Sequence, residues 1–401
     1  MSSALDANPS PPAPAAGKPA RTVSVAVVGA TGAVGQELLE LLAERSFPYS
    51  TVKLLASARS AGKKLNLGGQ QLTVEELTAE AFDGVDIALF SAGGSISKKF
   101  APIAAQAGAV VIDNSSAFRM DPACPLVVPE VNPEAMADVK LGAGTSGGGA
   151  SGAIIANPNC STIIALMATT AIHRAAGVRR MVVSTYQAAS GAGAAAMAEL
   201  ETQTREALDG KPADQWTQEI FGRPYAFNLF SHNSDLGDDG LNTEETKMVR
   251  ETHKIWADQK TPEGKPRPLP GRSASGRPAS AGRDSADEQE NTGISATCIR
   301  VPVMRAHAES INLTLDQPLS ADQARELLAG FPGVSIVDDR TGNRFPTPLD
   351  ASGKDDVLVG RLREDRSQPA GHGLDLFCCG DQIRKGAALN AIQIAEMLVG
   401  H

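Results

Sequence analysis

The sequence is poor in aromatic residues and has no concentrated run of basic side chains. Aromatic residues make up 4% of the 401 residues, and 46 acidic residues outweigh 37 lysines and arginines, giving a formal net charge of −9. Proteins that bind nucleic acid usually present a basic face, often with aromatic side chains among the cations. The composition therefore predicts no nucleic-acid partner. A site for an anionic ligand would have to gather its cations locally.

Cysteine is also scarce. The five cysteines are odd in number and none has the paired spacing of a zinc site, so we expect no metal and a reducing compartment. The adjacent Cys378 and Cys379 lie in the apolar run GLDLFCCG, which predicts that they are buried in a core.

No continuous apolar run has the length of a membrane span. The uncharged stretch 141–172 is interrupted by glycines and by the polar segment NPN, so we expect no membrane partner. Residues 1–20 are rich in Ala, Pro and Ser. We expect residues 1–21 to form a disordered tail, or at most a poor or truncated transit peptide.

Strand-like and helix-like segments alternate in the first part of the chain. The β-branched run VSVAVV is followed by the turn GATGAVG and by the helical leucines of QELLELLAER. The strand-like runs VKLLAS, GVDIALFSA and GAVVIDNSS follow, with the helix KKFAPIAAQAG before the last of them. This alternation predicts an α/β fold with a Rossmann-type, doubly wound parallel sheet in residues 22–159.

The pattern changes after Cys160. The segments RRMVVSTYQ, ATCIRVPV and ESINLTLDQ predict longer strands of a mixed sheet, with helices between them. We expect residues 160–375 to form an α+β catalytic and dimerisation domain, with a mobile insertion at 261–290. A glycine-serine linker is expected at 141–152. A C-terminal helix, residues 376–401, is expected to complete the first domain.

Gly29, Gly32 and Gly35 form a GxxGxxG turn that directly follows a strand and opens a helix. Residues without side chains let the backbone approach a pyrophosphate, and the N–H groups of the helix receive its charge. The spacing departs from the strict GxGxxG form. In this context it predicts a dinucleotide site, although a purely structural turn is the alternative.

The end of the second strand indicates which dinucleotide is bound. Ser57, Arg59 and Ser60 stand where an NAD enzyme usually places a carboxylate for the ribose hydroxyls. A guanidinium and two hydroxyls suit a 2′-phosphate, which a carboxylate would repel. NADP is therefore favoured, with a solvated basic loop as the alternative.

Cys160 lies in NPNCSTIIALMATTAI, where an extended segment ends and an apolar helix begins. The positive end of a helix dipole lowers the pKa of a thiol, so the position predicts a reactive thiolate. A buried structural cysteine is the alternative. Among the six histidines, His307 follows a strand in CIRVPVMRAHAES, and it is the candidate acid/base.

Ten motifs resemble those of the aspartate-semialdehyde dehydrogenases of plants, algae and bacteria. They occur in that family's order over most of residues 22–400: GATGAVGQE, ALFSAGGS, DNSSAFRMD, EVNPE, NPNCST, STYQAASGAG, EETKMVRET, RVPVMRAHAES, FPTPLD and RKGAALNAIQIAE. The resemblance implies reversible, NADP-dependent conversion of L-aspartate 4-semialdehyde and phosphate into 4-aspartyl phosphate through a cysteine thioester. It also implies a place in lysine, threonine, methionine and isoleucine biosynthesis. A homodimer or homotetramer is implied, in the plastid stroma of a plant or alga and otherwise in the cytoplasm.

The same motifs imply a role for each residue of the site. Cys160 would be the nucleophile, His307 the acid/base, and Gln187 would orient the substrate. Arg300 would bind the substrate carboxylate as a bidentate fork, and Glu244 would bind the amino group. The phosphate would be bound by Arg119, Asn159 and Lys247. The cofactor would contact Gly29, Thr31, Gly32, Ala33, Val34, Gly35, Ser57, Arg59, Ser60, Ser91 and Gly93, and its nicotinamide side Ser190, Gly191, Asn390 and Gln393.

Glu244 and Lys247 are three residues apart on a predicted helix, so they share one face and could meet opposite ends of a zwitterionic acyl phosphate. An ordinary ion pair along the helix is the alternative. Two related enzymes, N-acetyl-glutamyl-phosphate reductase and a glyceraldehyde-3-phosphate-type dehydrogenase, are the rival activities, and EETK before RVPVMRAH argues against the first. A non-catalytic, redox-sensing NADP-binding protein would have no use for Gln187, Arg300 and His307 together.

Overall fold

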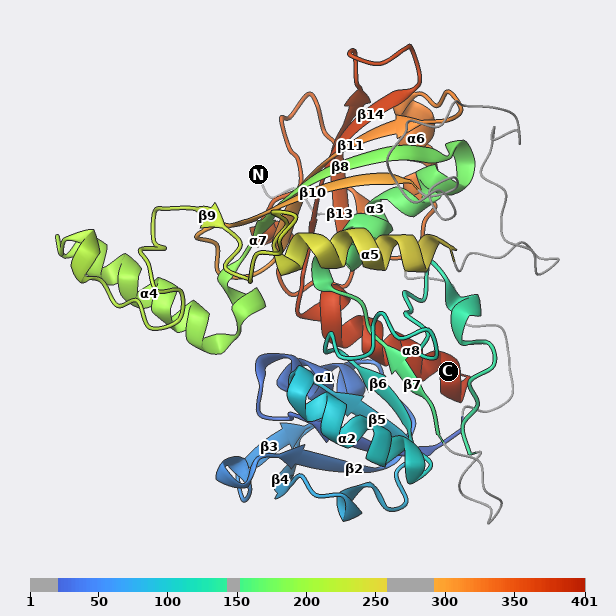
Figure 1. Cartoon of the computed structure of the whole chain (residues 1–401), viewed down its shortest axis with the longest axis vertical. Helices are drawn as coiled ribbons and strands as arrows, with labels where there is room; N and C mark the ends of the chain where they lie inside the picture. Colours follow the sequence, from blue (N-terminus) through green and yellow to red (C-terminus); the bar gives the residue numbers. More distant parts are fainter. Residues whose placement is uncertain (1–20, 143–151, 258–291, 401) are drawn as a thin grey trace, which may run out of the picture.

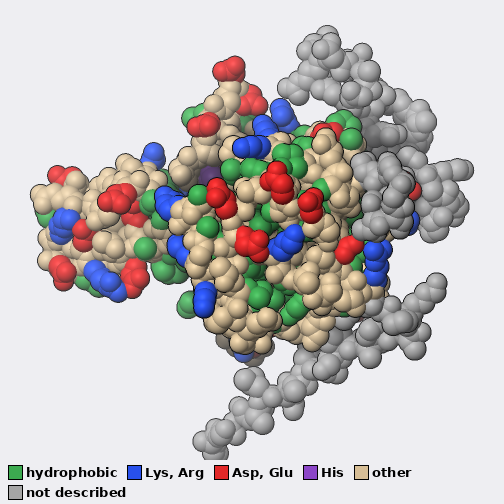
Figure 2. Space-filling model, turned by 90° about the horizontal axis from the view of Figure 1, so that it is seen from below, with side chains coloured by type: hydrophobic (Ala, Val, Ile, Leu, Met, Phe, Trp, Pro, Cys, Tyr) green, Lys and Arg blue, Asp and Glu red, His purple; other side chains and the backbone are tan. Residues whose placement is uncertain are grey.

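Two sheets, one above the other in Figure 1, form the framework of the protein. The computed structural model describes residues 21–142, 152–257 and 292–400. The predicted tail up to residue 20, most of the predicted linker and the whole insertion at 261–290 lie outside these ranges. Within them, no helix is long and apolar enough to cross a membrane. Acidic and basic side chains are interspersed over the face of the described residues seen in Figure 2.

The first sheet has seven strands in the order β3-β4-β2-β1-β5-β6-β7. Its strands are β1 (Val23–Val28), β2 (Tyr49–Ala56), β3 (Lys64–Leu67), β4 (Gln70–Glu76), β5 (Ile87–Phe90), β6 (Val110–Asp113) and β7 (Ile154–Ala156). All neighbours are parallel except β3 and β4. Apolar runs such as VSVAVV form these strands because both faces of the sheet are covered.

Helices cover both faces of this sheet. α1 (Ala33–Glu44) and α8 (Leu389–Val399) share one apolar core with β1, and α2 (Gly94–Gln106) packs on the other face. Figure 1 shows α8 beside the first sheet although it ends the described chain. The expected Rossmann-type, doubly wound sheet is therefore confirmed.

The second sheet also has seven strands, in the order β12-β13-β14-β11-β8-β10-β9. They are β8 (Val178–Gln187), β9 (Phe230–Ser231), β10 (Gly293–Arg300), β11 (His307–Leu315), β12 (Val334–Ile336), β13 (Val357–Glu364) and β14 (Gly373–Gly380). Parallel and antiparallel pairs are mixed, as expected. The helices of this part are α3 (Cys160–Ala176), α4 (Ala194–Leu208), α5 (Thr243–Ala257), α6 (Ala321–Ala329) and α7 (Pro348–Ala351).

α3 joins the two halves. It begins directly after β7 of the first sheet, and its apolar residues belong to the large core of the second. Nearly all of its side chains are buried because the helix lies between the second sheet and its neighbours α5 and α6. The segment around α4 projects away from both sheets (Figure 1).

Three expected boundaries are wrong. Residues 376–380 belong to β14, where Cys378 and Cys379 are fully buried as predicted, so the C-terminal helix proper begins only at Leu389. The strand expected to reach residue 303 ends at Arg300, because Pro302 lacks the N–H that a ladder needs. His307 does not follow a strand but begins β11.

The glycine turn after β1 is held by close backbone contact. A Cβ on Gly29 would lie 2.4 Å from the carbonyl oxygen of Ser91, and a Cβ on Gly35 would lie 2.3 Å from the oxygen of Gly29. Gly29 also has a φ of +84°. The turn therefore accepts only glycine at both positions.

This crowding predicts different costs of substitution at two glycines that have a similar φ. Gly69 has a φ of +91° with nothing within 4 Å of its would-be Cβ, so Gly69→Ala should cost only about 1–2 kcal/mol for the left-handed conformation. Gly29→Ala should cost about 1–3 kcal/mol more, because overpacking is added to that cost. Urea unfolding of both variants measures the difference. Equal losses of stability would contradict the close contact at Gly29.

Candidate active site

A cavity of about 370 Å³ extends from the glycine turn to the start of α3. The predicted residues that line it are Val34, Ser91, Gly93, Arg119, Asn159, Cys160, Gln187, Ser190, Gly191, Glu244, Lys247 and Arg300. They come from both halves of the chain. The structure thus brings Cys160, Gln187, the predicted substrate and phosphate residues and part of the cofactor residues to one place, whereas His307 is fully buried and is not among the residues that line this cavity.

Cys160 is the first residue of α3, as the sequence predicted. Asn159 caps the helix, since its side-chain oxygen accepts hydrogen bonds from the backbone N–H groups of Ser161 and Thr162, at 3.0 and 3.3 Å. Among the five cysteines, Cys160 is partly exposed and the other four are buried. The cavity therefore gives a ligand access to this thiol.

The thiol of Cys160 is not held as a thiolate, contrary to the expectation from the helix dipole. Its pKa is raised to about 12, chiefly by burial and also by the negative Glu244, while Arg119, Arg300 and Lys247 act in the opposite direction. The loss of solvation around the sulfur outweighs the cations because a buried anion loses its hydration. In the protein alone, Cys160 is a neutral thiol at pH 7.

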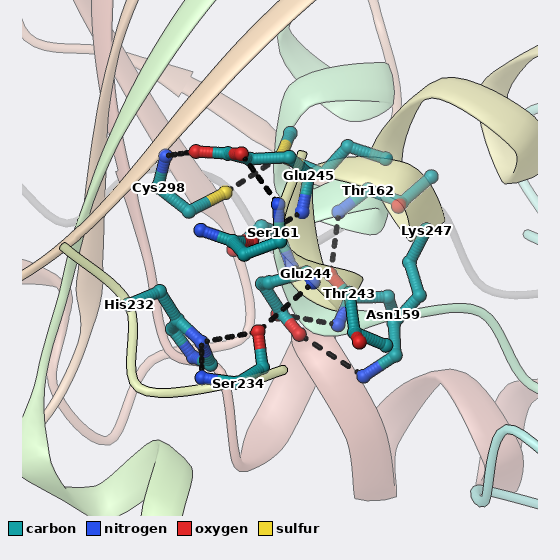
Figure 3. Close-up of polar contacts among 12 residues, drawn as sticks. Asn159, Ser161, Thr162, His232, Ser234, Thr243, Glu244, Glu245, Lys247 and Cys298 are labelled. Atoms are coloured by element: carbon teal, nitrogen blue, oxygen red, sulfur yellow. Dashed lines mark hydrogen bonds and ion pairs between the residues drawn. The ribbon is translucent and has the colours of Figure 1, made fainter. Parts of the chain in front are cut away.

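Glu244 is the central anion of the cavity (Figure 3). Its carboxylate accepts hydrogen bonds from Asn159 Nδ2 at 2.7 Å and from Lys247 Nζ at 3.1 Å. Burial alone would raise its pKa, but Lys247, His232 and the hydrogen bond from Asn159 lower it to about 2. Glu244 and Lys247 share one face of α5 as expected, and in the protein alone they pair with each other.

The two arginines are already engaged by the protein. Arg119 donates to Glu251 at 2.9 Å and to the carbonyl oxygens of Asn157 and Asn114 at 2.9 and 2.8 Å. These bonds use three of its five N–H groups. Arg119 therefore also holds the segment before Cys160, besides facing the cavity.

Arg300 lies at the end of β10 with 4% of its surface exposed. Its side chain donates to the carbonyl oxygen of Ala188 at 3.1 Å and to Asn233 Oδ1 at 3.2 Å, and it lies over the ring of Phe221. Burial lowers its pKa from the ordinary value, although Glu244 opposes that effect. The guanidinium is thus fixed in orientation before any ligand enters.

His307 lies immediately behind Gly191, where a Cβ on the glycine would be 3.1 Å from His307 Nε2. Its Nδ1 accepts a hydrogen bond from the backbone N–H of Ala188 at 3.1 Å, so the proton of the neutral ring is on Nε2. Burial and Arg300 lower its pKa to about 3. At neutral pH the ring is uncharged, and its Nε2–H has no partner among the described residues.

Gln187 links the elements of the site. Its amide nitrogen donates to Ser161 Oγ at 3.0 Å and to Thr185 Oγ1 at 3.2 Å, and it lies 3.5 Å from Glu244 Oε1. These contacts use the amide nitrogen, and none of them uses the amide oxygen. Gln187 therefore aligns the first turn of α3 with the end of β8.

Two sets of predicted cofactor residues are those of the glycine turn and those that follow β2. The turn residues lie at the start of α1. The helix has no side-chain cap, because its N-cap residue is Gly32, and its first turn contains no acidic residue. Thr31 and Ala33 of the turn are half-buried. Ser57 and Arg59 are exposed beside the 3₁₀ turn η1 (Ala58–Ser60), whereas Ser60 is buried.

Asn390 and Gln393 do not line the cavity. Asn390 donates to the carbonyl oxygen of Val127 at 2.9 Å, and Gln393 donates to Glu130 Oε1 at 2.8 Å. Both also accept hydrogen bonds from Lys385. Because these partners turn their amides into the protein, the geometry does not support direct contact with a nicotinamide.

Sequence reasoning missed several residues of the site. Gln382 donates to Ser190 Oγ and accepts from the backbone N–H of Ala306 at 2.9 Å, and His232 lines the cavity beside Glu244. Burial and Arg300 lower the pKa of His232 to about 4. The signal in the sequence for Gln382 was its position just before the motif RKGAALNAIQIAE. The other cavity residues that were missed are Asn114, Ser115, Asn157, Pro158, Ile383, Gly386 and Ala387.

Comparison with known proteins identifies the family. The models described as "Semialdehyde dehydrogenase, NAD binding domain" and "Semialdehyde dehydrogenase, dimerisation domain" match residues 24–139 and residues 170–266 with 281–385. The aspartate-semialdehyde dehydrogenase of Synechocystis sp. is 49% identical over 377 residues, which cover 94% of this chain and 97% of that protein. The chain belongs to the aspartate-semialdehyde dehydrogenase family.

Solved structures agree with this assignment. Aspartate semialdehyde dehydrogenase II of Vibrio cholerae, complexed with ASA, is 41% identical with a TM-score of 0.79, covering 95% of this chain and 99% of that one. The Candida albicans enzyme with NADP is 25% identical with a TM-score of 0.68, covering 94% and 98%. The chain is thus an oxidoreductase of the aspartate-semialdehyde dehydrogenase family, and the match to a dimerisation domain indicates an oligomer.

The raised pKa of Cys160 leads to a prediction about its reactivity. Because the thiolate is the reactive form, alkylation of Cys160 by iodoacetamide should accelerate about tenfold per pH unit from pH 7 to pH 10, without a plateau. The rate is measured by mass spectrometry of the peptide that contains Cys160. Alkylation of a small free thiol at the same pH values is the reference. A plateau between pH 7 and pH 8 would show instead that the helix dipole and the cations control the thiol.

Proposed function

We propose that the protein catalyses the reversible, NADP-dependent oxidative phosphorylation of L-aspartate 4-semialdehyde to 4-aspartyl phosphate, through a thioester on Cys160. In cells the reaction would run as reduction of aspartyl phosphate, in the pathway to lysine, threonine, methionine and isoleucine. One observation carries the proposal. The thiol opens into the same cavity as Glu244, Arg300 and Lys247, and that cavity extends to the glycine turn.

The charges of the cavity suit the two ends of this substrate. The carboxylate of aspartate semialdehyde would bind to Arg300, whose guanidinium is fixed by Ala188 and Asn233. Its ammonium would bind to Glu244, which stays ionised because its pKa is low. For this the Glu244–Lys247 pair has to open, and that frees Lys247 to bind phosphate together with Arg119 and Asn159.

His307 would act first as a hydrogen-bond donor. When the thiol adds to the aldehyde, a sulfur–carbon bond forms and the proton of the thiol ends on the former carbonyl oxygen. His307 Nε2–H, which lacks a protein partner, would donate to that oxygen and stabilise its developing charge. Oxidation of this hemithioacetal would leave a thioester, and its hydroxyl proton would pass to solvent. Phosphate held by Lys247 would then attack the thioester carbon. The carbon–sulfur bond would break, and the proton of the phosphate would pass to the sulfur as the thiol of Cys160 leaves.

The residues around the glycine turn fit an NADP molecule. The N–H groups at the start of α1 are free of side-chain caps, and Gly93 has open space above it, so a pyrophosphate could approach the backbone. Arg59 and Ser57 are exposed beside η1 and could reach a 2′-phosphate. Bound NADP supplies the hydride acceptor for the oxidation. Ser190 and Gly191 would lie on the nicotinamide side.

We also propose a homodimer or homotetramer as the working form, on the basis of the dimerisation-domain match. The relatives reported above are not plastid proteins by name, so a plastid location rests on the motif resemblance alone.

Replacing the nucleophile tests the proposed chemistry. Cys160→Ala should abolish the burst of NADPH formed from aspartate semialdehyde and phosphate, while NADPH binding persists because the glycine turn is a separate element. Stopped-flow absorbance measures the burst, and fluorescence titration measures binding. Cys124→Ala removes a buried thiol elsewhere and should keep the burst. Retention of more than trace turnover in Cys160→Ala would exclude the thioester mechanism.

The choice of cofactor is tested at the exposed arginine of η1. Arg59→Ala should weaken NADP binding by about 1.5–3 kcal/mol, because a charge-assisted hydrogen bond to the 2′-phosphate is lost. NAD has no such phosphate, so its affinity should be nearly unchanged. Calorimetric titration of each cofactor into the same variant gives the comparison. Equal losses for NADP and NAD would place the 2′-phosphate elsewhere.

A further inference from the structure

A lysine outside the cavity is fully buried, one residue before the glycine that packs on the nucleophile. Lys385 has 1% of its surface exposed and lies in the π-helical turn η6 (Arg384–Ala388), which connects β14 to α8. Its Nζ donates to Glu130 Oε2 at 2.6 Å, to Gln393 Oε1 at 2.7 Å and to Asn390 Oδ1 at 3.0 Å. All three N–H groups of the ammonium are therefore used.

Burying this cation is costly, and the chain supplies partners for it from two segments, the one around Glu130 and helix α8. Burial lowers the pKa of Lys385, while the carboxylate of Glu130 opposes that effect. Lysines are almost never fully buried unless they are paired. None of these partners is Cys160, and Lys385 does not line the cavity. Any effect of Lys385 on Cys160 must therefore pass through other residues.

One route from Lys385 to the nucleophile runs through side chains. Asn390, which accepts from Lys385, donates through Nδ2 to Asn157 Oδ1 at 2.6 Å. Asn157 in turn donates to Asn114 Oδ1 at 2.9 Å and to the carbonyl oxygen of Ala387 at 3.3 Å. Asn157 begins the NPNC segment that ends at Cys160. The ammonium therefore fixes the orientation of the amide that anchors this segment.

The second route runs through the backbone. Gly386 follows Lys385, and a Cβ built on it would lie 2.8 Å from Cys160 Cβ and 3.3 Å from Cys160 Cα. The backbone of η6 thus packs directly on the nucleophile, with no side chain between them. A shift of η6 by a few tenths of an ångström would move Cys160 or open a gap beside it.

We propose that Lys385 is a positioning residue for Cys160, which holds η6 and the Asn157–Asn159 segment in place against the nucleophile. The inference rests on the proposed role of Cys160 in the thioester mechanism. Lys385 does more than neutralise Glu130. Two of its three hydrogen bonds go to neutral amides, and the one to Asn390 continues to Asn157.

Two variants separate positioning from simple charge pairing. Lys385→Met removes the ammonium and leaves the charge of Glu130 buried without its partner, which destabilises the fold. Lys385→Met combined with Glu130→Gln leaves no unpaired charge, so it should recover most of the lost stability. The hydrogen bond to Asn390 stays absent in both. Thermal unfolding followed by circular dichroism measures the stability of each.

The kinetic readout is the division between kcat and KM. In the double variant we expect kcat to fall by about 100-fold, because a misplacement of about 1 Å at the reacting atom has that effect. The KM for NADP should change little, since the glycine turn and Arg59 are not part of this network. Alkylation of Cys160 by iodoacetamide should also change in rate. Arg325→Met combined with Asp338→Asn is the matched control. It also removes both members of an ion pair, and among the described residues no hydrogen bond or ion pair of these two side chains leads to η6, α8 or Asn157.

Wild-type kcat in the stable double variant would overturn the inference and leave Lys385 as a partner for Glu130 only. An equal loss of kcat in the Arg325→Met, Asp338→Asn control would overturn it as well, because the loss of any ion pair would then suffice. Failure of the inference differs from failure of the proposed function. In the first case Cys160→Ala is inactive while the double variant is active, and in the second Cys160→Ala itself retains turnover.

Discussion

A buried carboxylate ties the two halves of the active site together. Glu251 of α5 accepts from Arg119 at 2.9 Å and from the backbone N–H of Asn159 at 2.6 Å. Arg119 belongs to the first half of the chain, α5 belongs to the second, and Asn159 caps the helix that carries Cys160. Removing one member of such a buried pair costs about 3–5 kcal/mol, because an unpaired charge remains. The position of the nucleophile therefore depends on this contact before any substrate is considered.

The cavity combines fixed cations with a neutral acid and a neutral ring. Arg300 is held by backbone and amide oxygens, whereas Lys247 is held by Glu244, from which the ammonium group of a ligand could displace it. The thiol of Cys160 and the ring of His307 both lack charge because burial disfavours their ionised forms. An uncharged pair suits a reaction whose first step moves a proton within the site, since no buried ion has to be stabilised in the resting protein.

Local patterns in the sequence predicted local features of the structure. The glycine turn, the start of α3 at Cys160 and the shared face of Glu244 and Lys247 depend on neighbouring residues, and each lies where the pattern placed it. The resemblance to a family pointed to Arg119, Gln187 and Arg300, which line the cavity. The charge state of Cys160 was wrongly predicted because the dipole is a local effect, whereas desolvation depends on the packing of the whole site.

Long-range contacts could not be predicted from one sequence. Glu251 meets Arg119 across 132 residues of chain, and Lys385 meets Glu130 across 255. Neither pair has a spacing that a helix or strand would produce, so nothing in the local pattern distinguishes them from surface charges. Asn390 shows the same limit, because its motif pointed to the cofactor while its partners turn it towards Asn157.

The packing of α8 affects how the protein folds during synthesis. Its residues Ile392 and Ile394 belong to the core that also contains Val25 and Leu38, yet they are translated after the whole second sheet. Until α8 has emerged from the ribosome, one face of the first sheet lacks part of its apolar cover. Domains usually fold in order as they emerge, N-terminal first, but this one cannot finish folding before the second sheet has been made. The first domain therefore gains its full apolar cover only when α8 docks on it.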